Sequence, residues 1–200
     1  MNRVLSTEEL LVHWEAEGRP RKVVFTNGCF DLLHPGHVRY LTAARGLGDC
    51  LVVGLNDDAG VSRLKGPYRP YLTLAVRAEL LAALEAVDYV VPFSEDTPLE
   101  LVKRLRPDVL VKGGGYEKDM IVGGQEVVSW GGEVVVLPLE DDFSTTAMAL
   151  AIGDSTNAEM EEDISAIFRP YGVGMGGRAT KHKAKRDKRI HRAGGRRGRK

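Results

Sequence analysis

Two histidines in this sequence, His34 and His37, are spaced one helical turn apart across a Pro-Gly step. The run from Val23 to Phe25 before them is apolar, as in a buried strand, and a helical pattern begins near Pro35. Proline suits the first helical position because it lacks the amide hydrogen that would go unpaired there, and Gly36 leaves room for a ligand. An anion here would meet free amides, the positive end of the helix dipole and two imidazoles. The spacing therefore predicts a phosphate site, with helix capping by the histidines as the alternative.

Two other segments carry side chains that could hold phosphate oxygens. Lys65 is followed by Gly66 and Pro67, which predicts a loop. From these residues alone a solvated loop lysine is favoured, and a mobile ammonium that closes over the phosphates is the alternative. Arg63 and Arg69 are weaker candidates of the same kind. Three hydroxyl residues precede an Ala-rich helical start: Ser144, Thr145 and Thr146. Hydroxyls together with free amides at a helix start form an anion site. Helix capping alone would explain one of the three.

Strand and helix patterns alternate along the chain. The runs that are typical of strands are Lys22 to Thr26, Cys50 to Leu55, Tyr89 to Pro92, Asp108 to Lys112 and Glu133 to Leu137. Helical patterns lie near residues 37–46, 73–86, 98–105 and 124–130, and an earlier helix is predicted from Ser6 or Thr7 to near Gly18. Strands this rich in Val, Leu and Ile predict a doubly wound α/β fold with a five-stranded parallel sheet, of Rossmann-like type.

Polar and glycine residues follow these predicted strands, and the carboxyl ends of parallel strands share one edge of a sheet. Lys112, Gly113 and Gly114 end the fourth strand, where glycine lets a base or ribose approach the backbone, although an ordinary turn would use the same residues. Asp31 is expected to orient the loop before the histidines by accepting hydrogen bonds from local amides. The topology alone therefore brings the candidate residues together.

The motif TNGCFDLLHPGH, residues 26–37, resembles the signature of the nucleotidyltransferase superfamily, in which two histidines contact the phosphates of a nucleoside triphosphate. The resemblance extends over about residues 5–150 to the heptose 1-phosphate adenylyltransferases. It is carried by GLNDDAGVSRLKGPYRP (54–70), RAELLAALEAVDYVVPFSEDTP (77–98), DVLVKGGGY (108–116) and FSTT (143–146). Related domains are often fused to a sugar kinase, and we expect the stand-alone form here.

The resemblance implies roles for individual residues. His34, His37 and Lys65 are implied to be catalytic, by stabilising charge on the phosphates. Nucleotide binding is implied for Thr26, Asn27, Gly28, Cys29, Phe30, Gly36, Lys112, Gly113, Gly114, Ser144, Thr145 and Thr146. The acceptor phosphate is implied to lie near Asn56, Asp57 and Arg77; from the residues alone, Arg77 is either a phosphate contact or a surface residue. Gly115 departs from the family pattern, which has an acid before the tyrosine.

The implied reaction transfers AMP from ATP to D-glycero-β-D-manno-heptose 1-phosphate, giving ADP-heptose and pyrophosphate. Mg²⁺ is expected as a cofactor held mainly by the ATP phosphates, and no metal-binding residue is assigned. A cytidylyltransferase acting on glycerol phosphate is one alternative within the same class. A polyanion-binding protein that acts through its basic carboxyl-terminal segment is an alternative of another class.

Charge divides the chain unevenly. Residues 178–200 hold 12 of the 28 Lys and Arg but one acid, so they carry +11 while residues 1–177 carry −11. A segment this basic and polar cannot bury enough apolar surface to offset the conformational entropy that ordering costs, and we therefore expect a disordered tail. Nucleic acid or another polyanion is a candidate partner of this tail. The expected organisation is an N-terminal helix (1–20), a nucleotidyltransferase domain (21–152), a linker with a short helix (153–177) and the tail (178–200).

Cysteine usage and hydropathy restrict the compartment. The two cysteines, Cys29 and Cys50, give no disulfide framework and no paired metal-ligand spacing. Cys29 is expected to be a small packed side chain, with a nucleophile as the less favoured interpretation. The amino terminus has no apolar signal region and no run is long enough to span a membrane, so a soluble cytoplasmic protein is expected. A homodimer and a monomer are both left open.

Overall fold

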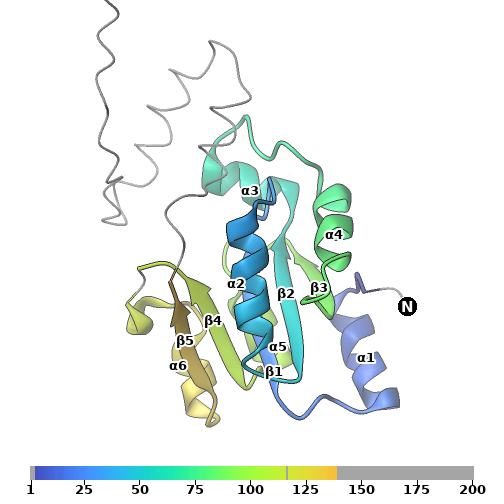
Figure 1. Ribbon diagram of the computed structural model, residues 1–200, viewed down its shortest axis with the longest axis vertical. Coiled ribbons are helices and arrows are strands. Elements are labelled where there is room, and N and C mark those ends of the chain that lie inside the picture. The colour runs from blue at the N-terminus through green and yellow to red at the C-terminus, as the bar shows by residue number, and fades with distance from the viewer. Residues whose placement is uncertain (1–2, 116, 139–200) are drawn as a thin grey trace, which may run out of the picture.

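Five apolar runs of the chain form one parallel sheet (Figure 1). The computed structural model describes residues 3–115 and 117–138. Every residue of the second strand is buried, as expected for a strand covered on both faces. All five predicted strands are confirmed to within two residues at each end: β1 (Val23–Gly28), β2 (Cys50–Asn56), β3 (Tyr89–Phe93), β4 (Val109–Gly113) and β5 (Glu133–Leu137).

The strand order is β3-β2-β1-β4-β5, with every neighbouring pair parallel. The chain therefore winds outward from β1 through β2 to β3, and then returns to the other side of β1 to add β4 and β5. The predicted doubly wound α/β class is confirmed. Because the order reverses between β1 and β4, the carboxyl ends of these two strands flank the switch point at which such sheets bind ligands.

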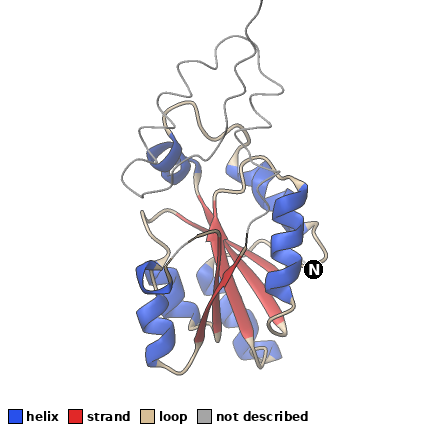
Figure 2. Ribbon diagram, turned by 60° about the vertical axis from the view of Figure 1, so that its left-hand side comes forward, coloured by secondary structure: helices blue, strands red, loops and turns tan. Residues whose placement is uncertain are grey.

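Helices cover both faces of the sheet (Figure 2). On one face, α1 (Thr7–Glu17), α5 (Leu99–Leu105) and α6 (Gly124–Ser129) contribute to a core that includes Trp14 and Phe25. On the other face, α2 (Pro35–Arg45) and α4 (Leu74–Ala82) pack over a second core that includes Leu41, Val53 and Leu81. Two apolar layers thus fix the strands from both sides and hold their carboxyl ends in place.

The predicted amino-terminal helix is present and begins with a capping box. The Ser6 hydroxyl accepts a hydrogen bond from the Glu9 amide at 3.2 Å, and the Glu9 carboxylate accepts one from the Ser6 amide at 2.7 Å. Leu10 and Trp14 of this helix are buried. The segment 1–20, predicted as a separate element, therefore contributes its described residues to the same core as the sheet.

One α-helix among the described residues was not predicted. Residues Asp58–Lys65 form α3, which Figure 1 shows above the carboxyl ends of the strands. Asp57 caps its amino end by accepting a hydrogen bond from the Gly60 amide at 2.6 Å, and Gly66 ends it with a φ of 95°. The sequence carries both of these end signals, but Gly60 inside a helix of eight residues lowers its helix propensity. The prediction that Lys65 lies on a loop is therefore wrong.

The remaining predictions about the overall organisation lie partly outside the described residues. A short 3-10 helix, η1 (Lys118–Met120), precedes α6. Within 3–115 and 117–138, no helix is long and apolar enough to cross a membrane. The predicted linker at 153–177 and the predicted tail at 178–200 lie outside the part of the chain that the structure describes.

Candidate active site

The helix α2 begins with the two predicted histidines side by side. His34 is the N-cap residue, with extended backbone at φ −139° and ψ 165°, and Pro35 occupies the first turn. The His34 Nδ1 accepts a hydrogen bond from the His37 amide at 3.3 Å, which leaves Nε2 as the protonated nitrogen of a neutral ring. The two rings stack with their centroids 3.7 Å apart and their planes at 24°. The prediction that His34 and His37 lie side by side is therefore confirmed, and His34 also caps the helix, which was the alternative interpretation.

His37 lies in a more enclosed setting than its partner. The Phe30 ring packs edge-on against it, with centroids 5.2 Å apart. Burial lowers the pKa of His37 from its ordinary 6.5 to about 4, and the nearby His34 and the Lys65 ammonium add to that effect. Burial also lowers the pKa of His34. Both rings are therefore neutral near pH 7, so they offer N–H donors without carrying charge of their own.

Lys65 brings the positive charge that the neutral histidines lack. It is the last residue of α3, and its side chain is half-buried. Its ammonium is a minor influence that favours a lower pKa at both His37 and Cys29, so its charge acts on the loop that carries the signature. Lys65 thus acts electrostatically on His37, which lies 28 positions earlier in the sequence.

The switch point between β1 and β4 is bridged by a lysine. The Lys112 ammonium, at the end of β4, donates hydrogen bonds to the Asn27 side-chain oxygen at 2.6 Å and to the Asn27 carbonyl at 3.4 Å. Burial lowers the pKa of Lys112 to about 8. Gly113 ends the strand, and Gly114 follows with a φ of 104° that an L side chain rarely adopts. A predicted nucleotide-binding lysine and asparagine thus meet across the site.

Other residues of the signature lie at the end of β1 and in the loop that follows it. The Thr26 hydroxyl is fully buried and lies 2.7 Å from the Tyr40 hydroxyl, so its side chain serves the core, and its predicted nucleotide contact stays a prediction. Phe30 adopts a φ of 43°, which is uncommon outside glycine. A Cβ at Gly28 would lie 3.0 Å from the Phe30 ring, so glycine allows the ring to sit there.

Cys29 in this loop and Gly36 in the first turn of α2 are also buried. Burial raises the pKa of the Cys29 thiol, with Lys65 acting in the opposite direction. A protonated, packed thiol is a poor nucleophile, so the expectation of a small packed side chain is confirmed. Direct contact of either residue with a nucleotide stays a prediction.

Arg77 is fully buried, so the interpretation of it as a surface residue is wrong. Its Nη1 donates to the carbonyl oxygens of Cys29 at 2.7 Å and Asn56 at 2.9 Å. Its Nε donates to the Leu72 carbonyl at 3.0 Å, and its Nη2 pairs with Asp58 at 2.7 Å. The guanidinium therefore joins the signature loop to the end of β2, and a direct contact with the acceptor phosphate stays a prediction.

The two other residues predicted near the acceptor are also held by protein groups. Asn56 is buried at the end of β2. The Asp57 carboxylate caps α3, and the Asp57 amide donates to the Phe93 carbonyl at 2.9 Å. These contacts explain why polar residues follow β2, and the acceptor contacts assigned to Asn56 and Asp57 stay predictions.

Asp31 holds a neighbouring segment, but its partners are not the local amides that were predicted. Its carboxylate pairs with Arg69 at 2.6 Å and accepts hydrogen bonds from the amides of Tyr71 and Leu72 at 2.8 and 3.0 Å. The partner Arg69 had been a weak candidate for binding phosphate. The other weak candidate, Arg63, donates to Asp96 at 2.8 Å. Nothing in the local spacing of the sequence could have revealed the contact between Asp31 and Arg69.

Three predicted site residues lie outside the described part of the chain: Ser144, Thr145 and Thr146. Their predicted contacts with the triphosphate stay predictions. Among the residues that are described, the site therefore consists of neutral imidazoles, helix amides and two lysines. This donor set can stabilise negative charge on phosphate oxygens.

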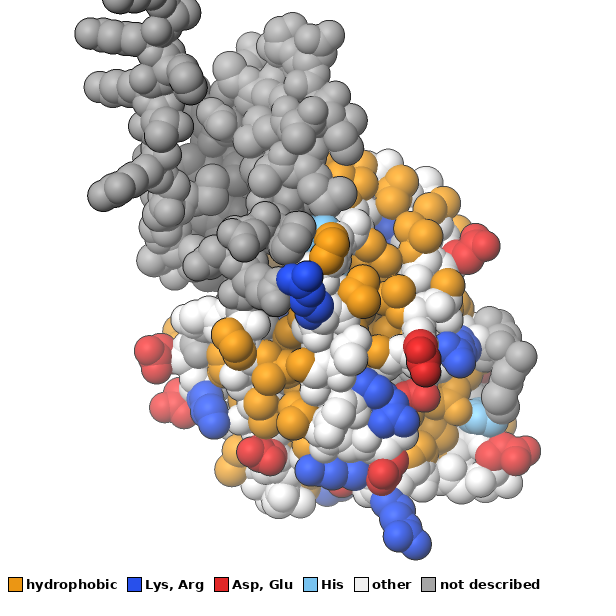
Figure 3. Space-filling model, in the orientation of Figure 1, with side chains coloured by type: hydrophobic (Ala, Val, Ile, Leu, Met, Phe, Trp, Pro, Cys, Tyr) orange, Lys and Arg blue, Asp and Glu red, His pale blue; other side chains and the backbone are white. Residues whose placement is uncertain are grey.

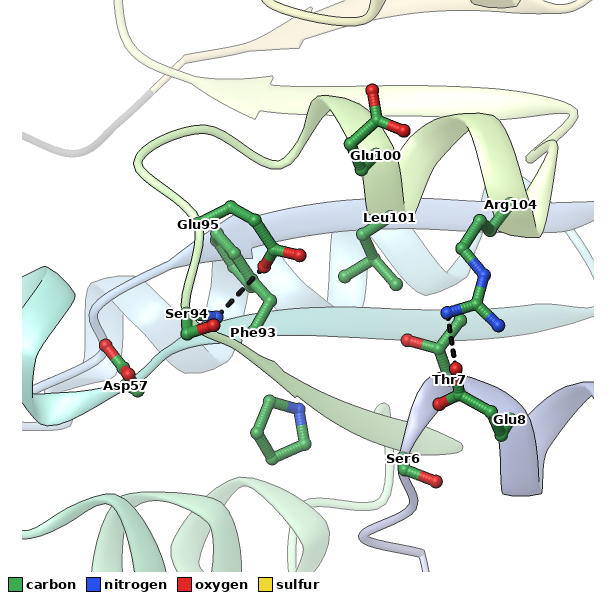
Figure 4. A pocket seen from close by; sticks show the side chains of 11 residues that line it. Ser6, Thr7, Glu8, Asp57, Phe93, Ser94, Glu95, Glu100, Leu101 and Arg104 are labelled. Atoms are coloured by element: carbon green, nitrogen blue, oxygen red, sulfur yellow. Dashed lines mark hydrogen bonds and ion pairs between the residues drawn. The ribbon is translucent and has the colours of Figure 1, made fainter.

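A cavity of about 370 Å³ opens elsewhere, at the carboxyl end of β3 between α1 and α5 (Figure 4). Carboxylates line it, among them Glu8, Glu95 and Glu100, and Arg104 pairs with Glu8 at 2.6 Å. Asp57 is the one predicted site residue in its lining. A phosphate would be repelled by these carboxylates, so the cavity does not suit an anionic substrate.

Comparison with known proteins agrees with this geometry. Residues 25–166 match the model of the cytidylyltransferase-like family. The chain is 56% identical over 145 residues to the bifunctional protein HldE of Magnetococcus marinus, covering 72% of this chain and 29% of that protein. It is 60% identical over 128 residues to the bifunctional protein HldE of Syntrophotalea carbinolica, covering 64% of this chain and 26% of that protein.

The chain thus spans 29% and 26% of the lengths of these two relatives. Among solved structures, it is similar to the crystal structure of the lipopolysaccharide core biosynthesis protein from Thermoplasma volcanium GSS1. The TM-score is 0.50 at 26% identity, covering 60% of this chain and 96% of that one.

Proposed function

The chain belongs to the cytidylyltransferase-like family, and from this premise we propose that it is an adenylyltransferase. It transfers AMP from ATP to D-glycero-β-D-manno-heptose 1-phosphate and releases pyrophosphate, giving ADP-heptose. The observation that carries the proposal is the stacked pair of rings, His34 and His37, at the start of α2. A helix start of this kind accommodates phosphate oxygens.

In the proposed reaction, the main task of the protein is to stabilise the negative charge that develops on the phosphate oxygens. An oxygen of the sugar phosphate attacks the α-phosphorus of ATP, the bond to the bridging oxygen breaks, and pyrophosphate leaves with the electron pair. The sugar phosphate is mostly a dianion near neutral pH, because the second pKa of a phosphate monoester is about 6. No side chain has to remove a proton from the nucleophile, which suits a site built from donors.

Each donor has a distinct part in this step. The His34 and His37 N–H groups donate to the phosphate oxygens on which negative charge grows, and the amides at the start of α2 add to them. The Lys65 ammonium supplies full charge near the leaving pyrophosphate. Lys112 holds Asn27 across the switch point and places a second cation beside the nucleotide.

The similarity of the chain to other proteins supports heptose 1-phosphate as the acceptor. The motifs from residue 54 to residue 146 resemble heptose 1-phosphate adenylyltransferases, and identity to the two HldE proteins is 56% and 60%. The related crystal structure is described as that of a lipopolysaccharide core biosynthesis protein. A sugar acceptor that is used in lipopolysaccharide core biosynthesis is consistent with both observations.

We propose that Mg²⁺ arrives with ATP. Among the described residues, no three His, Cys, Asp or Glu side chains cluster to hold a metal ion, so this donor set does not fit a metal held by the protein alone. Mg²⁺ commonly keeps several waters and binds substrate phosphates instead. No step of the proposed reaction is assigned to the metal.

The test is a screen of ATP and CTP against heptose 1-phosphate and glycerol 3-phosphate, with Mg²⁺ present or omitted and pyrophosphate detected. Release is expected only with ATP, heptose 1-phosphate and Mg²⁺ together. Replacement of His37 by Ala should lower kcat by about a hundredfold or more, since removing one charge-stabilising donor costs that much.

The matched control is His13→Ala. His13 lies on α1 and contacts the Tyr89 hydroxyl at 3.0 Å, away from the site. This variant should keep kcat within about twofold, as expected for a residue away from special features. Equal losses in His13→Ala and His37→Ala, or release with CTP in place of ATP, would refute the proposed function.

A further inference from the structure

The segment from Gly66 to Leu72, directly after Lys65, is joined to the signature loop by a buried ion pair. The Arg69 Nε lies 2.6 Å from Asp31 Oδ2. The Arg69 side chain is 6% exposed and the Asp31 side chain is fully buried. Because Asp31 lies three residues before His34, the ion pair joins the segment after the lysine to the loop that carries the histidines.

The second oxygen of the same carboxylate fixes the rest of the segment. Asp31 Oδ1 accepts hydrogen bonds from the amides of Tyr71 and Leu72 at 2.8 and 3.0 Å. One carboxylate therefore holds three donors from a single short stretch of chain. This geometry fixes the path of the backbone between residues 69 and 72.

The segment is in turn tied back to the helix that ends at Lys65. The Ser62 hydroxyl of α3 donates to the Arg69 carbonyl at 2.5 Å, and the Arg69 amide donates to the Gly66 carbonyl at 3.2 Å. A displacement of Arg69 would therefore act on both ends of the turn that follows Lys65. The contacts make a continuous connection from Asp31 through Arg69 and Ser62 to the last turn of α3.

We propose that Asp31 and Arg69 are positioning residues, whose buried ion pair holds the end of α3 so that the Lys65 ammonium lies beside His37. This inference rests on the proposed function, because it gives Lys65 its place in charge stabilisation. Neither residue of the ion pair is assigned a contact with substrate. Their effect on the reaction passes through Lys65.

The physical character of the pair suits this role better than a role in stability. A buried ion pair contributes little to stability relative to apolar side chains of the same volume, because both charges lose their hydration. Its directional hydrogen bonds, in contrast, fix the position of the segment. The Arg69 guanidinium also lies over the Tyr71 ring, 4.3 Å from its centroid, and its Nη2 is buried with no hydrogen-bond partner among the described residues. The loss of Asp31 would therefore leave a buried cation without its counter-charge.

A double-mutant cycle separates positioning from an independent role. Asp31→Asn keeps an oxygen for the amides of residues 71 and 72 but removes the charge, and Lys65→Gln removes the ammonium. We expect kcat in Asp31→Asn to fall by roughly ten- to a hundredfold with little change in KM, since misplacing a catalytic group by about 1 Å has effects of this size. Asp31→Asn/Lys65→Gln should lose no more than Lys65→Gln alone. A double mutant whose loss is the product of the two single losses overturns the proposal.

An NMR titration of His37 gives a readout that needs no activity. The Lys65 ammonium lowers the pKa of His37, so moving it away should raise that pKa toward 6.5 in both Asp31→Asn and Lys65→Gln. Removal of the Asp31 charge acting directly on His37 would lower the pKa, which is the opposite sign. An unchanged or lowered His37 pKa in Asp31→Asn overturns the proposal. If the wild type releases no pyrophosphate, the proposed function fails, and the titration still tests the placement of Lys65.

Two variants control for folding and for the loss of an ion pair in general. Glu8→Gln breaks the exposed pair with Arg104 on the other face of the sheet, and it should change neither kcat nor the pKa of His37. Arg69→Lys keeps the charge and loses the planar fork, so it should show the same coupling to Lys65 in weaker form. It replaces Asp31→Asn in the cycle if that variant does not fold. Losses in Arg69→Lys that are independent of Lys65 contradict the proposal.

Discussion

Two residues of the site, His37 and Lys112, have pKa values that burial has lowered, and the consequences differ. His37, with a pKa of about 4, is neutral near pH 7 and acts as a hydrogen-bond donor without charge. Lys112, with a pKa of about 8, is still mostly charged near pH 7 but loses its proton in mildly alkaline solution. The electrostatics of the site are therefore set by its lysines and helix amides.

The lowered pKa of Lys112 predicts a pH dependence of ATP binding. The ammonium attracts the triphosphate only while it is protonated, so affinity for ATP should be full below the pKa and should fall as the pH rises through 8. Calorimetric titrations with ATP, one pH unit below and one above that value, measure the fall. Lys112→Arg stays charged throughout and should bind with an affinity that hardly changes over this range. The same fall in the variant would show that another group is responsible.

The connection between α2 and β2 shows how backbone packing at the scale of elements constrains the sequence. Gly48 lies in this connection, where a Cβ would stand 2.6 Å from the Lys22 carbonyl oxygen and 2.7 Å from Val24. Glycine thus lets the chain pass close to the start of β1 as it enters β2. Gly46, two residues earlier, has ordinary helical backbone at φ −63°, and a Cβ there would meet its nearest atom at 3.4 Å.

Alanine at these two glycines should therefore have opposite outcomes. Gly48→Ala forces backbone against backbone, and we expect the free energy of unfolding to drop by about 1–3 kcal/mol or more. Gly46→Ala fits without strain, so it should leave the free energy of unfolding unchanged or raise it by about 0.4–1 kcal/mol, because alanine lowers the conformational entropy of the unfolded chain. Urea denaturation of the two variants compares them directly. Equal destabilisation of both would contradict the packing at Gly48.

At the scale of the whole molecule, the charge is unevenly distributed along the chain while the body has a mixed surface. Figure 3 shows positive and negative side chains interspersed over the visible face, with hydrophobic side chains gathered over α4 and the loop that leads into it. The exposed large hydrophobic residues of α3, α4 and the loop between them are Leu64, Tyr68, Tyr71, Val76 and Leu80. With −11 on residues 1–177, the body does not draw anions from a distance. The attraction of phosphate must come from the local donors of the site.

Residues 178–200 carry a charge of +11, which predicts that this segment binds polyanions independently of the enzymatic activity. A chain that ends at residue 177 should keep its pyrophosphate release within about twofold, because the proposed donors all precede that point. The full chain should bind a DNA fragment with an affinity that falls steeply with salt, and the shortened chain should not. Fluorescence polarisation at two salt concentrations measures both. DNA binding that survives the truncation would place the polyanion site in the body of the protein.

The sequence alone determined the strands, the class of the sheet and the edge at which the site lies. Apolar runs at residues 23–25, 50–55 and 109–111 are local signals, because a strand covered on both faces needs an apolar side chain at nearly every position. The spacing of His34 and His37 is equally local, since one helical turn fixes which side chains meet. These features follow from neighbouring residues, and for that reason the pattern was sufficient.

Only the tertiary structure decided which distant groups meet. Arg69 reaches Asp31 across 38 positions, and Arg77 reaches the Cys29 carbonyl across 48. Both arginines looked like candidates for binding phosphate or solvent, and both are buried against protein groups. A charged side chain has the same local pattern whether it faces water, substrate or a carboxylate from another loop. The packing of α3 and α4 over the carboxyl edge of the sheet makes that choice, because it removes the charge from water and requires a partner at a definite place.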